Sequence, residues 1–192
     1  YFGKLMTPER QEALSSTSGG EIGTGNVYRD TVSQMGKDGW LTLNWPEEYG
    51  GQNRDPMDSL IFTDEAAIAG APVPFLTINS VAPTIMHFGS EEQKKFFLPK
   101  IAAGDLHFSI GYSEPGAGTD LASLRTTAVR DGDDYVINGT KHFISHADLA
   151  GFLEAQVVFA VDVDVRHRVA PWGVIVRASS GGVAFRAVLP VV

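Results

Sequence analysis

The chain has 192 residues, of which 43% are hydrophobic, and this is enough for the core of one large domain or two small ones. Its 15 Lys and Arg residues stand against 23 Asp and Glu, so the net charge is −8 and a nucleic-acid binder is disfavoured. The absence of cysteine excludes disulfides, thiolate metal sites and cysteine nucleophiles. No apolar run approaches the roughly 20 residues that span a bilayer, and the first residues do not resemble a secretory signal. We therefore expect a globular cytoplasmic protein that binds neither nucleic acid nor membrane.

Helical patterns dominate the chain up to about residue 104. The segment Pro56–Ala69 predicts a helix, because a proline suits a first helical turn and a glycine with two prolines follows the segment. Several of its apolar residues recur at helical spacing near one face, namely Leu60, Ile61, Ala67 and Ile68.

Two further helices are predicted before the pattern changes. Phe75–Phe88 is typical of a mostly buried helix, which we expect Pro83 to kink or divide. The capping-box pattern at Ser90–Gln93 predicts the start of the next helix. We expect that helix to end near Leu98, before Pro99.

After Gly104 the pattern is that of β-strands, with β-branched residues and turn signals in place of helical spacing. Asp131-Gly132 and Asn138-Gly139 are hairpin-turn pairs, because both positions can adopt positive φ. The expected strands are Leu106–Tyr112, Leu124–Val129, Tyr135–Asn138, Lys141–Ser145, Val157–Val163, Trp172–Val176 and Val183–Leu189. The sequence therefore predicts an α+β protein, with a helical N-terminal domain in residues 1–105 and an antiparallel β domain in residues 106–192.

The segment Tyr112–Asp120 follows an expected strand and contains two glycines one residue apart. Such glycines allow a backbone to approach a ligand and to turn amide groups toward phosphate oxygens, and Ser113 and Thr119 add hydroxyl donors. A glycine-rich turn without a ligand is the simplest alternative. A dinucleotide-binding βαβ unit is disfavoured, because no long amphipathic helix follows and the strands are joined by hairpins. These residues alone leave the turn and the ligand loop both open.

Four blocks of the sequence occur in the order and spacing of a known family. They are GWL with WPEEYGG in residues 39–51, FGSEEQK with LP, Ile and Gly in residues 88–104, YSEPGAGTD in residues 112–120, and YVINGTK in residues 135–141. Together they resemble the acyl-CoA dehydrogenases over about residues 39–145. The tail from Ala147 onward resembles that family only loosely.

The resemblance implies a helical N-terminal domain, a β-barrel-like middle domain and a C-terminal helical bundle, the last of which is missing from this chain. It implies an FAD-dependent oxidoreductase of lipid β-oxidation that oxidises the Cα–Cβ bond of an acyl-CoA. In that reaction a glutamate removes the α proton, and a hydride passes from Cβ to flavin N5. Because the glutamate of the family lies in the missing bundle, we assign no catalytic residue in this chain.

The resemblance also assigns flavin contacts to Ile110–Thr119 and Lys141–Ser145. Ser145 takes the position whose hydroxyl lies near flavin N5, and Phe143 replaces the tryptophan that usually shields the flavin ring. Thr119 matches a residue at the phosphate and CoA edge, so it is a substrate-binding candidate as well. The cofactor-binding candidates are Ile110, Tyr112, Ser113, Gly118, Thr119, Phe143, Ile144 and Ser145.

Other conspicuous residues have ordinary structural explanations. Glu114 lies within the segment Ile110–Thr119, but the resemblance gives it a structural role, and Trp40 and Trp45 are expected to be packing anchors. The five histidines lack the spacing of metal ligands, so we expect no metal site. Without the resemblance, Phe143 fits a core aromatic residue and Ser145 a hydroxyl at a strand end.

Several functions stay open. The first is a dehydrogenase that works as a homo- or hetero-oligomer, a dimer or tetramer, and passes electrons to an electron-transfer flavoprotein or similar acceptor. The second is an acyl-CoA oxidase or flavin monooxygenase, for which O₂ is the acceptor. The third is a non-catalytic partner subunit, because Phe62–Glu65 and Gly70–Asn79 resemble actinobacterial relatives with bulky steroid or polyketide-like substrates, some of them heterotetramers with incomplete flavin sites. A ligand-free β domain is the fourth.

Overall fold

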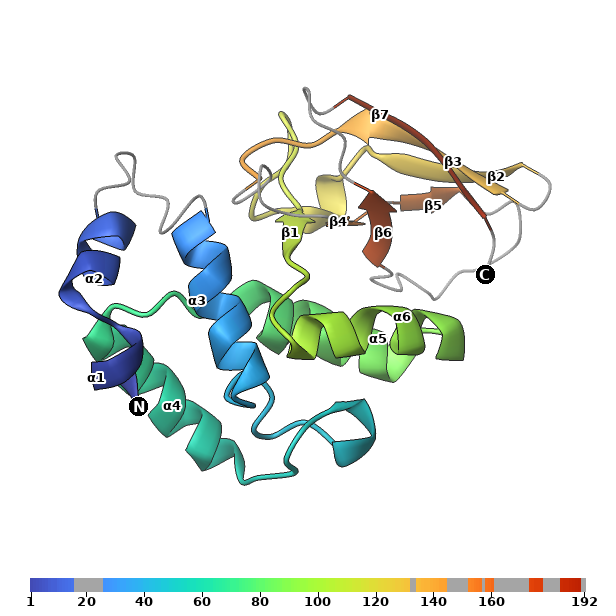
Figure 1. Ribbon diagram of the computed structural model, residues 1–192. Helices are drawn as coiled ribbons and strands as arrows, with labels where there is room; N and C mark the ends of the chain where they lie inside the picture. Colours follow the sequence, from blue (N-terminus) through green and yellow to red (C-terminus); the bar gives the residue numbers. More distant parts are fainter. Residues whose placement is uncertain are drawn as a thin grey trace. The chain divides into compact units, whose positions relative to one another are not determined.

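The computed structural model describes residues 1–15, 26–131, 134–144, 152–156, 158–160, 173–177 and 184–190, with the side chains of residues 1–15, 26–129 and 137–144. The chain divides into two compact units, Tyr1–His107 and Phe108–Val192. The first unit is helical, and the second is built from strands (Figure 1).

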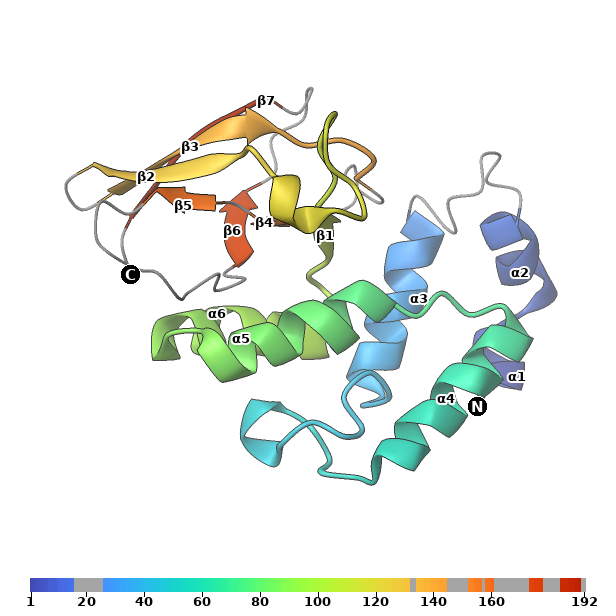
Figure 2. The same cartoon turned by 180° about the vertical axis from the view of Figure 1, so that it is seen from behind.

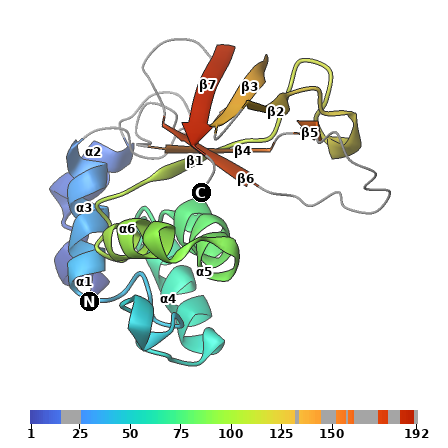
Figure 3. The same ribbon diagram turned by 90° about the vertical axis from the view of Figure 1, so that its right-hand side faces the viewer.

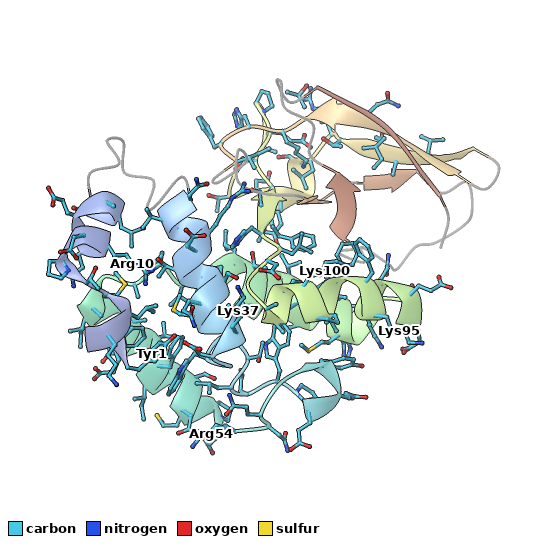
Figure 4. All side chains as sticks on the ribbon, viewed as in Figure 1. Tyr1, Arg10, Lys37, Arg54, Lys95 and Lys100 are labelled. Atoms are coloured by element: carbon cyan, nitrogen blue, oxygen red, sulfur yellow. The ribbon has the colours of Figure 1, made fainter. Side chains whose placement is uncertain are left out.

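The first unit consists mainly of helices. They are α1 (Phe2–Leu5), α2 (Pro8–Ser15), α3 (Asn26–Lys37), α4 (Pro56–Ala69), α5 (Ala82–Phe88) and α6 (Glu91–Ala102), with a 3-10 turn at Glu47–Tyr49 and a π-helical turn at Thr77–Val81. Arg10 of α2, labelled in Figure 4, donates to the carbonyl oxygen of Leu5 at 2.7 Å and so links α2 to the end of α1.

The core of the first unit includes the contact between α3 and α6. Val32 of α3 and Leu98 of α6 are fully buried, and burying side chains of this size contributes about 2 kcal/mol each. The two backbones come so close that a Cβ added to Gly36 would lie 2.3 Å from the backbone of Ala103. A residue without a side chain is therefore required where these helices meet.

Helix α4 has the predicted bounds. The side chain of Asp55 accepts the amide N–H of Met57, and Gly70 ends the helix in the left-handed conformation. The apolar residues that share the predicted spacing are nevertheless exposed, and Phe62 and Ala66 are the buried residues of the helix. Because α4 is apolar around most of its circumference, spacing alone cannot tell which face packs against the unit.

Prolines shape α5 and α6 in different ways. The predicted division at Pro83 is confirmed, because a π-helical turn ends and α5 begins just before this residue, which has no N–H for a regular helical hydrogen bond. The capping box is also confirmed: Gln93 N–H donates to Ser90 Oγ at 3.2 Å and Ser90 N–H to Gln93 Oε1 at 2.9 Å. The predicted end before Pro99 is wrong, since α6 runs through this proline to Ala102.

Packing explains why α6 continues past Pro99. Leu98 and Ile101, on either side of the proline, are both buried, and burial of this apolar face outweighs the lost hydrogen bond. Helix α6 lies next to α5 (Figure 3). The tryptophans pack as expected: Trp40 stacks on Phe62 with ring centroids 5.6 Å apart, and Trp45 is buried.

The described strands of the second unit form two sheets. One contains β1 (Phe108–Gly111), β4 (Phe152–Gln156) and β6 (Gly173–Arg177), in the order β1-β4-β6. The other contains β5 (Val158–Ala160), β2 (Thr127–Asp131), β3 (Asp134–Thr140) and β7 (Ala184–Pro190), in the order β5-β2-β3-β7. The view from behind shows β3 between β2 and β7 (Figure 2).

The predicted antiparallel pairing holds for β2 with β3, β3 with β7 and β4 with β6. Two further pairs, β1 with β4 and β2 with β5, are parallel. Among the described strands the pairing gives two open sheets, and no barrel closure is present.

One of the two predicted hairpin turns is wrong. Asp131 pairs with Asp134, so a hairpin does join β2 to β3 there, with residues 132–133 outside the described residues. Asn138 and Gly139 instead lie inside β3 and pair with β7. The glycine is required by packing, because a Cβ on Gly139 would lie 2.1 Å from Thr126 Oγ1.

The strand predicted over Lys141–Ser145 is not formed by its described part, because β3 ends at Thr140 and residues 141–144 are irregular. Ser145 lies outside the described residues. Within the described ranges, no helix combines the length and the apolar character that crossing a membrane requires.

Candidate functional site

The glycine loop, residues 112–119, leaves β1 and folds back in a tight turn. Glu114 N–H donates to the carbonyl oxygen of Ala117 at 2.8 Å, and Ala117 N–H returns a hydrogen bond to that of Glu114 at 3.1 Å. Both of these residues are buried, whereas Gly116, Gly118 and Thr119 are exposed. The turn therefore has one packed side and one side open to solvent.

A buried ion pair fixes the packed side of the glycine loop. Lys141 Nζ lies 2.9 Å from Glu114 Oε1, and the two side chains are 0% and 6% exposed. Lys141 Nζ also donates to the carbonyl oxygen of Tyr112 at 3.1 Å. A buried charge is costly unless it is paired and hydrogen-bonded, so each of the two side chains needs the other.

Glu114 has further hydrogen-bond donors in the backbone just before β2. Arg125 N–H donates to Glu114 Oε2 at 2.7 Å, and Thr126 N–H donates to Oε1 at 3.0 Å. Burial by itself raises the pKa of Glu114, but hydrogen bonds from Thr126, Lys141 and Arg125 outweigh it and lower the pKa to about 2. Glu114 is therefore a carboxylate at neutral pH with its oxygens occupied, which makes it a poor general base.

A second link joins the glycine loop to residues 141–144, hereafter the 141–144 segment. His142 N–H donates to the carbonyl oxygen of Ser113 at 3.0 Å. Two consecutive residues, Lys141 and His142, thus bind two consecutive carbonyl oxygens, those of Tyr112 and Ser113. The two segments are held together in space although β2 and β3 separate them in the sequence.

Phe143 has an unusual conformation in this segment. Its φ is +54°, in the left-handed region that residues with a Cβ rarely adopt, and its side chain is 86% exposed. Its ring centroid lies 4.1 Å from that of His142, with 34° between the ring planes. An aromatic ring is thereby presented to solvent next to the glycine loop's anchor.

The two exposed glycines of the loop are not required by the fold. A Cβ added to Gly116 or Gly118 would meet no atom within 4 Å, and neither glycine has a positive φ. Gly139 behaves differently, because Thr126 fills the space where its Cβ would lie. Close approach of a ligand to the loop backbone would explain the glycines that packing does not.

The structure brings the described candidates together in two neighbouring segments. Ile110, in β1, is half-buried, as are Tyr112, Ser113 and Ile144, whereas Gly118, Thr119 and Phe143 are exposed. Ser145, the candidate for flavin N5, lies outside the described residues.

Sequence reasoning included Lys141 and His142 in a flavin-contacting segment, but it did not predict that they bind Glu114 and the glycine loop. No local signal could have found this pairing, because polar residues and a glycine, Asn138-Gly139-Thr140, directly precede Lys141. Among the residues that the structure describes, no group of three or more His, Asp or Glu side chains could hold a metal ion.

Two domain families match the chain. Residues 20–105 match the N-terminal domain of acyl-CoA dehydrogenases, and residues 109–192 match the middle domain. This chain belongs to the acyl-CoA dehydrogenase family. Within the family, the glycine loop and the 141–144 segment both fall in the middle domain.

Relatives within the family share much of the sequence. Acyl-CoA dehydrogenase FadE26 of Mycobacterium tuberculosis (strain ATCC 25618 / H37Rv) is 75% identical over 153 residues, which cover 80% of this chain and 38% of the relative. The ChsE4-ChsE5 complex from Mycobacterium tuberculosis is similar in structure, with a TM-score of 0.76 and 70% identity over 83% of this chain and 39% of that chain. The steroid ACAD Tcur3481-Tcur3483 has a TM-score of 0.82 and 40% identity over 100% of this chain and 53% of that chain. The chain thus spans 38% to 53% of the length of these relatives.

Proposed function

We propose that this chain is the flavin-binding part of an FAD-dependent acyl-CoA dehydrogenase, which oxidises the Cα–Cβ bond of an acyl-CoA thioester. The observation that carries this proposal is the connection of the glycine loop to the 141–144 segment by the Glu114–Lys141 ion pair. These are the two segments to which the family resemblance assigns flavin contacts. Family membership and the names of the relatives support the same function.

The residues present fit an FAD group. The loop backbone at Gly116 and Gly118 is open to close approach, and Ser113 and Thr119 supply hydroxyl donors beside it. Phe143 supplies an exposed aromatic face for a planar ring. The bound FAD would supply the acceptor for a hydride from the substrate Cβ.

Each candidate residue has a distinct task in this proposal. Tyr112 and Ser113 orient the cofactor's ring system, and Thr119 donates a hydrogen bond to a phosphate oxygen of the cofactor or of CoA. Phe143 excludes water from one face of the ring. Glu114 takes no part in proton transfer, because its carboxylate is committed to Lys141 and two backbone amides. We propose that the carboxylate that removes the α proton lies outside this chain.

The relatives also bear on substrate and partners. One of the two similar structures is named as a steroid ACAD, and both names join two components. We therefore propose a bulky, steroid-derived acyl-CoA as substrate and a second subunit as partner. From the family resemblance, we also propose an electron-transfer flavoprotein, or a similar acceptor, for the reoxidation of the cofactor.

A second candidate function is a non-catalytic partner subunit of a heteromeric dehydrogenase. The two-component names of the similar structures favour it. In that case the glycine loop and the 141–144 segment would stabilise the subunit without retaining flavin by themselves.

The absorption spectrum of the purified full-length protein separates the two candidates. We expect the absorption band of bound oxidised flavin at ~450 nm. The band should bleach when an acyl-CoA is added, and the reaction should consume no oxygen. Bleaching accompanied by H₂O₂ formation in air would indicate an oxidase. A protein that carries no flavin would support the partner-subunit function and contradict the first proposal.

A further inference from the structure

Phe143 brings the fold little stabilisation of its own. Its side chain is 86% exposed, so its ring adds little buried apolar area, and its φ of +54° is unfavourable for a residue with a Cβ. Residues keep such a combination where the surrounding structure imposes it, and such places are often binding or catalytic sites.

The residues that impose this conformation are identifiable. Lys141 is held by Glu114 and by the carbonyl oxygen of Tyr112, and His142 N–H is held by the carbonyl oxygen of Ser113. The segment is thus anchored by the side chain of Lys141 and the backbone amide of His142, and the left-handed conformation falls on the next residue. The imidazole of His142 then lies against the Phe143 ring, at 4.1 Å between centroids.

We propose that Glu114, Lys141 and His142 are positioning residues that hold Phe143 left-handed, with its ring presented to a planar aromatic ligand. This inference rests on the proposed function, in which the ligand is the ring system of FAD. The ion pair and the His142 amide set the backbone, and the imidazole limits rotation of the ring. Of these four residues, only Phe143 would contact the ligand, and the other three act by positioning Phe143.

A purely structural role for the ion pair makes a different prediction. In that case Glu114 and Lys141 would only stabilise the second unit. Removing them would then change the FAD affinity by the same factor whether or not the Phe143 ring is present. Positioning instead predicts energetic coupling: once the ring is absent, removal of the pair should cost little further FAD affinity.

The first variant is Phe143→Asn in the full-length protein. Asparagine accepts left-handed backbone more readily than phenylalanine, so the melting temperature of the FAD-free protein should stay equal or rise. The dissociation constant for FAD should increase about tenfold, and the visible circular dichroism of bound FAD should change. A lower melting temperature with unchanged FAD binding would show that Phe143 is a packing residue and would overturn the inference.

The second test is a cycle between Phe143→Asn and the double variant Glu114→Gln/Lys141→Met. The double variant removes both buried charges together and keeps their volume, so no unpaired charge is left inside. We expect the double variant to weaken FAD binding about as much as Phe143→Asn does. The triple variant should bind FAD as tightly as the double variant and Phe143→Asn. Should the double variant not fold, His142→Ala removes the half-buried imidazole, keeps the amide N–H, and tests whether the imidazole is coupled to Phe143 in the same way.

The matched control is Glu91→Gln/Lys94→Met, which removes an exposed ion pair in the first unit and should leave FAD binding unchanged. If the loss of the ion pair and the loss of the Phe143 ring each raise the dissociation constant for FAD by an independent factor, this inference is wrong. The proposed function would not be affected by that result. Failure of the wild-type protein to bind FAD would overturn both.

Discussion

Thr126 fills the space beside Gly139 in the hairpin of β2 and β3: a Cβ added to the glycine would lie 2.1 Å from Thr126 Oγ1. The same threonine donates its amide N–H to Glu114, and Lys141 follows the glycine by two residues. The missing side chain at Gly139 therefore allows both ends of the buried ion pair to reach each other.

Gly139→Ala should destabilise the second unit by about 1–3 kcal/mol, because Thr126 must move and carry its hydrogen bond with it. Urea unfolding followed by circular dichroism measures the loss. An unchanged unfolding midpoint would show that the hairpin has more room at this point than the structure gives it.

Gly118→Ala should behave in the opposite way. Its Cβ meets no atom within 4 Å and its φ is not positive, so we expect stability within about 0.5 kcal/mol of the wild type. A methyl group on the exposed side of the glycine loop should nevertheless weaken FAD binding, since it keeps the cofactor away from the backbone. Titration of the FAD-free protein with FAD tests this, and wild-type affinity would contradict a role for Gly118.

Lys141→Met should be among the most damaging single changes in the second unit. It leaves the Glu114 carboxylate buried without its partner, at a cost of about 3–5 kcal/mol. Lys94→Met is the matched control, because its partner Glu91 is 73% exposed, and it should cost less than about 1 kcal/mol. Similar melting temperatures for the two variants would show that the ion pair contributes nothing.

Glu114 gives the stability of the second unit a defined pH dependence. Its pKa is lowered to about 2 from an ordinary 4.5, so the unfolded chain binds this proton more tightly than the folded one. The resulting stabilisation, on the order of 3 kcal/mol, is fully present above about pH 4.5 and is lost as the pH falls through about 2. The unfolding free energy of Glu114→Gln, measured across this pH range, should lack this part of the pH dependence. If the wild type and Glu114→Gln show the same dependence of unfolding free energy on pH, the prediction is wrong.

Ser145→Ala should slow reduction of the flavin by an acyl-CoA with a modest effect on FAD retention. This expectation comes from the family resemblance, which assigns the serine hydroxyl to the neighbourhood of flavin N5. Stopped-flow absorbance under anaerobic conditions measures the rate. A wild-type rate would remove Ser145 from the site.

Much of the helical unit could be predicted because its signals are local. The capping box of Ser90 and Gln93 is complete within four residues, and Gly70 ends α4 for the reason that the sequence suggests. Pro99 defeats such reasoning, since the burial of Leu98 and Ile101 that keeps α6 intact comes from the rest of the unit.

The site shows the same division. The two segments could be named from their resemblance to a family, but what joins them could not, because nothing in the spacing of Glu114 and Lys141 predicts that they meet. Any rule that uses only adjacent residues in the sequence predicts a turn at Asn138-Gly139. Only the fold shows that Thr126 stands opposite this glycine.

The pairing of β3 on both sides has a practical consequence for shortened versions of the protein. Thr140, the last residue before Lys141, pairs with Ala184 of β7, and Asp134 pairs with Pro190. Removing residues 184–190 would convert β3 into an edge strand with unpaired backbone groups, prone to pairing with another chain. Such a fragment would keep every cofactor-binding candidate. It would nevertheless lose the pairing of β7 with β3, the strand that directly precedes Lys141.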